Sequence, residues 1–205
     1  MVMAKSADVI HDNSDIRRKS VQMNKELIMD TAARLFAESS YESVSLDDIA
    51  DKIGATKGLI YHYFPSKGTL LGELLLWNHD LFLLNVNPAW ETAGADAADI
   101  LKKVIKAHIE FCYDYSYIET IVYRTTNFVP VEMRKKINRV REAYARKFRL
   151  LVEEVQKTGQ LVKGDSDSVA ASIIALANYL PYRYRSGDSK RRKETYGLIV
   201  RLFFL

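Results

Sequence analysis

Residues 56–62, Thr-Lys-Gly-Leu-Ile-Tyr-His, bring together side chains that can bind an anionic polymer. Lys57 can neutralise a phosphate or donate to a guanine edge, and the glycine that follows it lets a backbone approach closely. Tyr61 and His62 can donate to phosphates. Free N–H groups and hydroxyls at helix starts also favour a phosphate. The pattern predicts DNA contacts from a set made of Ser45, Thr56, Lys57, Gly58, Tyr61, His62 and Lys67.

Two short helices joined by a glycine turn are needed to position this set. Ser45 and Asp48 form the sequence pattern of a capping box, and Gly54 suits the left-handed residue that ends a helix. Thr56 caps the next helix, which Pro65 ends. Helix, turn and helix is the DNA-binding arrangement whose second helix enters the major groove. The alternative is a solvated helical hairpin that packs on another surface. In either case Leu59, Ile60 and Phe64 are expected in the core.

The segment from Ile28 to Leu71 resembles the TetR family of bacterial transcriptional regulators. The resemblance is carried by Ile-Met-Asp-Thr-Ala-Ala-Arg-Leu-Phe-Ala-Glu from Ile28, by Tyr41, by Ser-Leu-Asp-Asp-Ile-Ala from Ser45, by Gly54, and by Thr-Lys-Gly-Leu-Ile-Tyr-His-Tyr-Phe-Pro-Ser-Lys from Thr56. Two positions depart from the family pattern. Ser40 replaces a glycine, and Gly68 replaces an acidic residue after Lys67.

Composition is consistent with a globular protein and sets few other limits. The chain has 205 residues, a net charge of +4 and a hydrophobic fraction of 48%. The excess positive charge favours an anionic partner, but only mildly. Cys112 is the single cysteine, so no internal disulfide can form, which fits a reducing cytoplasm. No apolar run approaches the roughly 20 residues that span a bilayer, and no signal peptide is evident. We therefore expect a cytoplasmic protein that does not enter a membrane.

Apolar residues recur at helical spacing along almost the whole chain, which predicts an all-α protein of about nine helices. We expect a flexible arm over residues 1–17, a DNA-binding domain over 18–66, and an effector-binding and dimerisation domain over 67–205. Residues 85–94, which contain Pro88, are predicted to interrupt the chain between helices. The last two helices, from Asp167 and from Ser189, are expected to form the dimer interface, with a final exposed apolar stripe at Tyr196, Ile199, Val200 and Phe203.

Aromatic residues gather in residues 111–128, more densely than a small helical core needs. The run from Asn178 to Gly187 mixes tyrosines with arginines and could clasp an anionic or aromatic group. That run is also weakly similar to the branch of the TetR family that senses CoA thioesters, although Arg183 and Ser186 depart from its pattern. Plain core tyrosines, and arginines that satisfy helix-end carbonyls, are the alternatives. The expected ligand-binding set is Trp77, Phe111, Tyr113, Tyr117, Tyr123, Arg124, Asn178, Tyr182, Arg183 and Arg185.

Sequence motifs for catalysis are absent. There is no Gly-x-Ser-x-Gly, no Cys–His set and no glycine-rich phosphate loop. The four histidines are too scattered to predict a metal site, and His79 is interpreted as a helix-surface residue. No enzyme activity, metal or cofactor is expected.

The resemblance implies a transcriptional repressor that binds a palindromic operator as a homodimer and is released by a small molecule. The expected effector is an acyl-CoA thioester or another small apolar molecule. Two alternatives remain open: a multidrug-efflux repressor with a promiscuous hydrophobic pocket, and an architectural DNA-binding protein without an effector.

Overall fold

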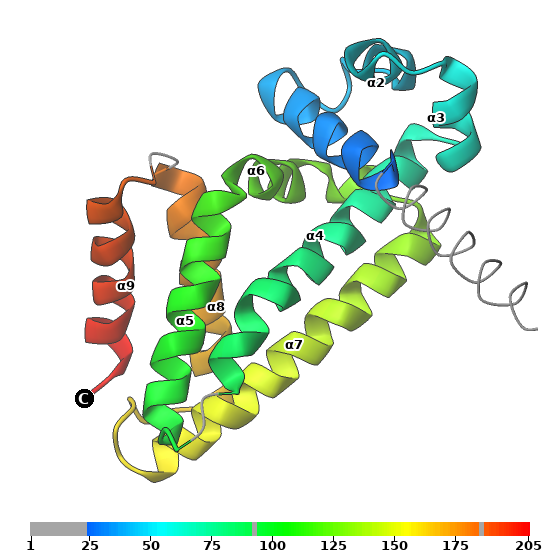
Figure 1. Ribbon diagram of the computed structural model, residues 1–205. Coiled ribbons are helices and arrows are strands. Elements are labelled where there is room, and N and C mark those ends of the chain that lie inside the picture. Colours follow the sequence, from blue (N-terminus) through cyan, green and yellow to red (C-terminus); the bar gives the residue numbers. More distant parts are fainter. Residues whose placement is uncertain (1–23, 92–93, 185–186) are drawn as a thin grey trace, which may run out of the picture.

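In the computed structural model, residues 24–91, 94–184 and 187–205 are described, and they form an all-α protein, as the sequence predicts (Figure 1). The first helix occupies residues 24–38 of the described chain. The later elements are α2 (Leu46–Ile53), α3 (Lys57–Tyr63), α4 (Lys67–Trp90), α5 (Ala97–Asp114), α6 (Ser116–Thr125), the 3₁₀ turn η1 (Thr126–Phe128), α7 (Val131–Lys157), α8 (Ser166–Tyr184) and α9 (Ser189–Phe203). The predicted arm, residues 1–17, lies outside the described residues.

The first three helices form a small unit at one end of the molecule (Figure 1). The predicted capping box is confirmed, because the Ser45 hydroxyl accepts from the Asp48 N–H and the Asp48 carboxylate accepts from the Ser45 N–H. Gly54 ends α2 with a left-handed φ of 67°, which turns the chain into α3. Thr56 caps α3, and Ile60 and Phe64 are fully buried beneath it. These caps and buried side chains fix the orientation of α3 relative to α2.

Helix α4 connects this unit to the rest of the molecule and runs further than the sequence predicts. It continues through Pro88 to Trp90, so the predicted interruption over residues 85–94 is wrong in its first part. Proline removes a backbone hydrogen bond from the helix, and side-chain packing stabilises the last turn instead. Val86 is fully buried, and the Trp90 ring meets the rings of Tyr144 and Phe148 edge-on. Burial of these side chains holds the last turn in place beyond the proline.

The remaining helices form a bundle around the second half of α4. Helix α4 packs along α5 and α7, while α8 packs against α5 and α7 (Figure 1). The starts predicted for the last two helices hold to within a residue, because α8 begins at Ser166 and α9 at Ser189. Two buried clusters result. One fills the bundle; the other lies under the first three helices and includes Ile118, Ile121, Val129 and Ile137 from α6, α7 and the segment between them. The three-helix unit therefore shares its core with the bundle.

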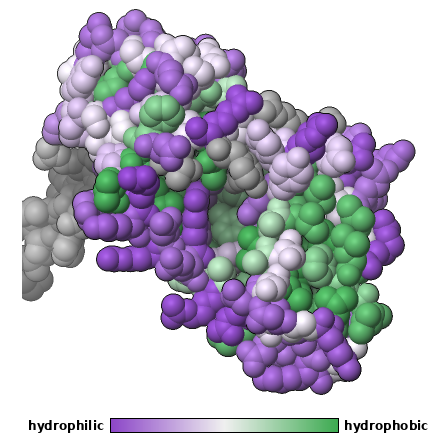
Figure 2. Space-filling view, turned by 180° about the vertical axis from the view of Figure 1, so that it is seen from behind, coloured by the Kyte–Doolittle hydropathy of each residue, from purple (hydrophilic) through white to green (hydrophobic). Residues whose placement is uncertain are grey.

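The outer faces of α8 and α9 carry exposed apolar side chains, but not the expected ones. Ile199 is fully buried, and Tyr196 and Phe203 pack against the bundle core, so the predicted stripe faces inward onto α5. The exposed large apolar residues of α9 are Leu198 and Leu202, at 38% and 51% exposure. The view from behind shows an apolar surface gathered on the side of the bundle where α8 and α9 lie (Figure 2). None of the helices described is both long and apolar enough to cross a membrane.

Candidate DNA interface and ligand pocket

One face of α3 is open to solvent and carries the side chains expected to contact DNA. Lys57, Gly58 and His62 are exposed, and Tyr61 is 49% exposed. A Cβ added at Gly58 would meet no atom within 4 Å, so nothing in the described protein crowds that backbone. Leu59 is exposed as well, at 37%, which corrects the expectation that it lies in the core. The surface thus has a basic end, a bare backbone patch and an aromatic hydroxyl.

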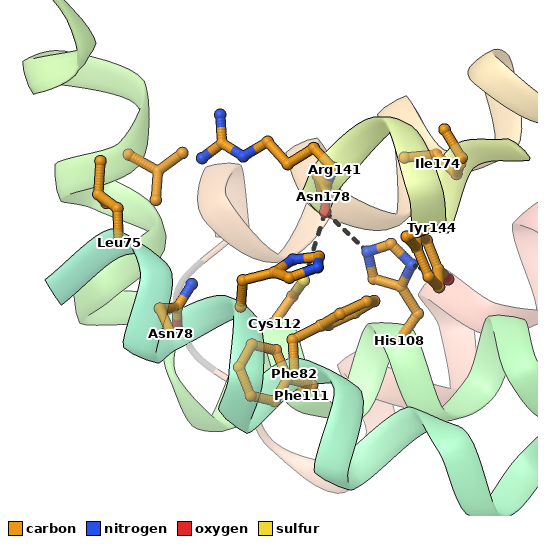
Figure 3. A pocket seen from close by; sticks show the side chains of 13 residues that line it. Leu75, Asn78, Phe82, His108, Phe111, Cys112, Arg141, Tyr144, Ile174 and Asn178 are labelled. Carbon is orange, nitrogen blue, oxygen red and sulfur yellow. Dashed lines mark hydrogen bonds between the residues drawn. The ribbon is translucent and has the colours of Figure 1, made fainter. Parts of the chain in front are cut away.

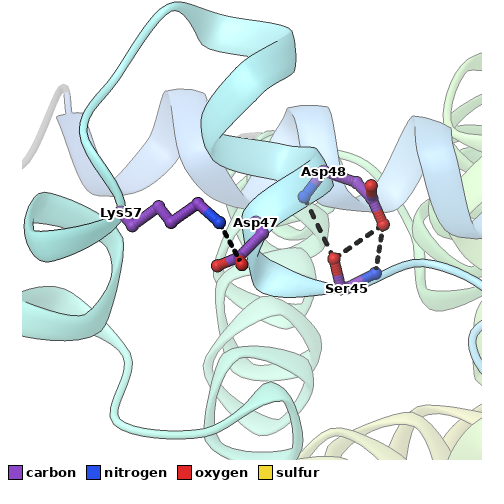
Figure 4. A network of polar contacts seen from close by, with 4 residues as sticks. All are labelled: Ser45, Asp47, Asp48 and Lys57. Carbon is purple, nitrogen blue, oxygen red and sulfur yellow. Dashed lines mark hydrogen bonds and ion pairs between the residues drawn. The ribbon is translucent and has the colours of Figure 1, made fainter.

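Lys57 is held by an ion pair that the sequence does not predict. Its ammonium group donates to Asp47 at the start of α2, across the turn (Figure 4). This hydrogen bond raises the pKa of Lys57, which therefore stays charged. The other Asp47 oxygen is buried without a hydrogen-bond partner among the described residues. The pair is exposed, so its net stabilisation is small and an incoming phosphate can compete for the lysine.

Three other residues of the predicted DNA-binding set have structural contacts. The Ser45 hydroxyl donates to the Asp48 carboxylate, and the Ser45 hydrogen bonds lower the pKa of that carboxyl group (Figure 4). The Thr56 hydroxyl accepts from the Leu59 N–H at 3.3 Å. The Lys67 ammonium donates to three backbone carbonyls of residues 41–44, at 2.8, 3.3 and 3.0 Å. These residues position the exposed face of α3.

A pocket of about 350 Å³ lies in the bundle between α4, α5, α6, α7 and α8 (Figure 3). Helix α4 contributes four of its lining side chains at helical spacing, so one face of this helix forms a wall. The lining residues are Leu75, Asn78, His79, Phe82, His108, Phe111, Cys112, Val122, Arg141, Tyr144, Ala145, Ile174 and Asn178. The volume is at the small end of the range for ligand sites, roughly 300–1,000 Å³.

A chain of hydrogen bonds fixes one side of the pocket. His108 Nε2 lies 2.7 Å from Asn178 Oδ1, and its Nδ1 lies 3.1 Å from the Tyr144 hydroxyl. Because the amide oxygen only accepts, His108 donates from Nε2 and accepts at Nδ1 from the tyrosine. Burial lowers the pKa of His108 to about 4 and raises that of Tyr144. Both groups are therefore neutral near pH 7.

The other polar side chains of the pocket come from α4 and α7. Asn78 is 7% exposed, and its Oδ1 is buried without a hydrogen-bond partner among the described residues. His79 is 9% exposed, so its interpretation as a surface residue is wrong. Burial lowers the pKa of His79. Arg141 brings a guanidinium group from α7 to the lining (Figure 3).

Of the ligand-binding residues predicted from the sequence, Phe111 and Asn178 line this pocket. Others have different partners: the Tyr113 hydroxyl pairs with Thr195 at 2.8 Å, and the Tyr117 hydroxyl donates to Asp30 at 2.6 Å. Trp77 packs against the cluster under the first three helices. Arg124 and Arg183 are exposed, and Tyr182 is partly buried beside Tyr179. The Tyr123 side chain and Arg185 lie outside what the structure describes.

A signal for the missed pocket residues was present in the sequence. Asn78 and His79, followed by Asp80, interrupt the apolar residues of α4, and Arg141 lies beside the apolar stripe of α7 one turn before Tyr144. Polar residues on the buried face of a helix need partners, so such interruptions point to a polar site inside the core. The aromatic residues of 111–128, by contrast, for the most part pack against other side chains rather than line the pocket.

Comparisons with known proteins match both halves of this architecture. Residues 28–74 match the tetR family of bacterial regulatory proteins, and residues 94–204 match the tetracyclin repressor-like C-terminal domain. The uncharacterized HTH-type transcriptional regulator YuxN of Bacillus subtilis is 43% identical over 56 residues, which is 27% of this chain and 19% of that protein. The matches to the first curated relatives cover less than two thirds of those proteins.

Solved structures of TetR-type regulators have the same fold over most of the chain. The regulator PfmR from Thermus thermophilus superposes with a TM-score of 0.75 at 22% identity, covering 85% of this chain and 97% of that one. AibR, in a complex with isovaleryl coenzyme A and operator DNA, gives a TM-score of 0.76 at 21% identity over 86% of this chain and 96% of that one. One family match covers the N-terminal helices, and the other covers more than half of the chain. The chain therefore belongs to the TetR family of bacterial regulatory proteins.

Proposed function

We propose that the protein is a transcriptional repressor that binds a palindromic operator as a homodimer in the bacterial cytoplasm and is released by a small molecule. The observation that carries the proposal is the exposed face of α3, where Lys57, the open backbone at Gly58 and Tyr61 lie together. Two-fold symmetry would place a second copy of this face one helical turn of DNA away, or a multiple of it.

The pocket supports the effector part of the proposal. Helix α4 begins at Lys67, directly after the DNA-binding helices, and lines the pocket from Leu75 to Phe82. A ligand that binds one position of α4 better than another shifts the population toward that position. Because α4 leads straight into the DNA-binding unit, this shift changes the separation of the two α3 helices in a dimer. DNA affinity falls when that separation no longer matches the operator.

DNA binding is tested first, with a duplex selected from a randomised library and anisotropy measured at several salt concentrations. We expect Lys57→Ala and Tyr61→Ala to weaken binding without lowering the unfolding temperature. Loss of the Lys57 phosphate contact should reduce the salt slope of log K by roughly 1. Lys163→Ala is the matched control, because Lys163 is exposed in the segment between α7 and α8, remote from α3 (Figure 1). Unchanged affinity for both α3 variants would place the interface elsewhere.

A further inference from the structure

Most polar side chains of the pocket already have partners within the protein. His108 lies within hydrogen-bond distance of both Asn178 and Tyr144, and His79 bonds the backbone of α7. Arg141 also has a contact of its own. These paired groups therefore give no information about what the pocket binds.

Asn78 differs from these residues. It is 7% exposed and lines the pocket from α4 (Figure 3). Its Oδ1 is buried and has no hydrogen-bond partner among the residues that the structure describes. Buried polar atoms are almost always paired, and one without a partner destabilises the folded chain. A polar side chain at this position therefore indicates a partner that is not part of the chain.

A hydroxyl group is a suitable partner for this side chain. Because no hydrogen bond to a described residue fixes the Asn78 amide, its oxygen and nitrogen can exchange places by rotation about the Cβ–Cγ bond. A hydroxyl group both donates and accepts, so it can pair with whichever amide atom faces the pocket. Leu75 and Phe82 line the pocket one helical turn before and after Asn78. The rest of the ligand therefore meets apolar side chains.

We propose that the pocket binds an apolar molecule with a hydroxyl group, a phenol or an alcohol, and that this hydroxyl is hydrogen-bonded to Asn78. This assignment rests on the proposed function, because it names the chemical class of the molecule that releases the repressor. The hydrocarbon part of the ligand lies against Leu75 and Phe82, within a space of about 350 Å³. Asn78 is thus the residue that selects the ligand.

Asn78 also lies where a ligand can act on the three-helix unit. Leu75, one turn before it on α4, lines the pocket and also belongs to the buried cluster under the first three helices. Leu71 and Leu74 are fully buried in the same cluster. The hydrogen bond to Asn78 therefore forms next to the part of α4 that is packed beneath this unit. A ligand that gains this bond in one position of α4 favours that position.

Calorimetry on the full-length protein with matched compounds tests the assignment. Each pair replaces a hydroxyl group by a methyl group of similar size: 4-ethylphenol with 4-ethyltoluene, and benzyl alcohol with ethylbenzene. We expect at least one hydroxyl compound to bind about tenfold more tightly than its methyl counterpart, and Asn78→Leu to abolish that preference. Asn138→Leu, at an exposed position of α7, is the matched control and should keep the preference.

Thermal unfolding without ligand gives a second readout. At equal protein concentration, Asn78→Leu should raise the unfolding temperature by about 3 °C, because an apolar side chain of similar size replaces the unpaired amide. An asparagine with a purely structural role would have its partners inside the protein, and its loss would lower the unfolding temperature.

Several results would overturn the proposal. These are equal binding of hydroxyl and methyl compounds to the wild type, a preference that survives in Asn78→Leu, a lower unfolding temperature of that variant, or no binding of either hydroxyl compound at millimolar concentration. The wild-type comparison is decisive even if the variant fails to fold. Operator binding is measured in parallel. Intact DNA binding without a hydroxyl preference refutes the ligand class alone, whereas wild-type protein that binds no selected duplex refutes the repressor function itself.

Discussion

At the scale of single residues, some polar side chains near α3 stabilise the fold, and others can contact DNA. Ser45 and Thr56 use their hydroxyls to cap helices. Lys57 has a partner in Asp47, but the pair is exposed, and such pairs contribute roughly 0–1 kcal/mol. DNA can therefore take over the lysine at little cost. Gly58 offers no side chain at all, and this makes it a sharp probe of the interface.

Gly58→Ala should separate stability from DNA binding. Alanine favours a helix over glycine by up to about 1 kcal/mol, and the added methyl group meets no protein atom within 4 Å. We expect the free energy of unfolding to stay the same or to rise. The methyl group should, however, stand between α3 and the DNA backbone and weaken operator binding roughly tenfold, or about 1.4 kcal/mol. Urea unfolding and anisotropy measure the two effects; unweakened binding would show that DNA does not approach this backbone.

His108 should make stability depend on pH between about 4 and 6.5. Its pKa is about 4 in the folded protein against 6.5 in the reference state, so the unfolded chain binds more protons across this range. Stability is therefore lost as the pH falls, by about 3 kcal/mol at the lower end. Urea unfolding from pH 4.5 to 7.5 should show a shallower slope for His108→Gln than for the wild type. Identical slopes would mean that His108 is not buried as a neutral group.

At the scale of elements, most helix ends follow from local signals, but the end of α4 follows from packing. Caps such as Ser45 and left-handed residues such as Gly54 are encoded within a few residues, so they could be predicted. The continuation of α4 past Pro88 depends on Trp90 meeting side chains of α7, which no local pattern shows. The pocket depends in the same way on five helices meeting. Its residues were missed because their polarity has meaning only once their neighbours are known.

Tyr117→Phe should weaken the contact between α6 and the first helix. The hydroxyl donates to Asp30 at 2.6 Å, and Arg34, which also pairs with Asp30, lies over the Tyr117 ring at 4.5 Å. A hydrogen bond to a charged group contributes about 1.5–3 kcal/mol when buried. Since Tyr117 is only partly buried, we expect the free energy of unfolding to fall by about 1 kcal/mol. Tyr61→Phe, at a position of α3 that is 49% exposed, is the control and should not change the free energy of unfolding in the absence of DNA. Equal stability of both variants would contradict the prediction.

At the scale of the whole molecule, the fold class was predictable from the sequence, but the side chains exposed on α9 were not. Helical periodicity places apolar residues along α9. It cannot tell which of two adjacent faces meets α5, because both contain large apolar residues. The structure buries Ile199 and leaves Leu198 and Leu202 in solvent. Together with the exposed Tyr179 on α8, these residues form the surface on which a dimer is proposed.

Leu202→Glu combined with Leu198→Glu should produce a monomer. A charge at the centre of an apolar interface opposes association, whereas these exposed positions contribute little to the fold. Sedimentation at micromolar concentration should show the wild type at twice the chain mass and the variant at the chain mass, with weakened binding to a palindromic duplex. Leu84→Glu, at a position that is 71% exposed on α4, is the control and should remain dimeric. A dimeric double variant would move the interface off α9.

The three carbonyl contacts of Lys67 have a consequence for genetics. They fasten the first turn of α4 to the loop at residues 41–44, and the ammonium also lies 4.4 Å from the centre of the Tyr41 ring. We therefore expect the three-helix unit to move together with α4. A screen for strains that ignore the inducer should yield pocket substitutions that still silence the target gene. If the protein is the proposed dimeric repressor, substitutions at Lys67 should appear instead among strains in which the gene is permanently expressed, because the loosened unit would no longer hold both α3 helices at the operator spacing.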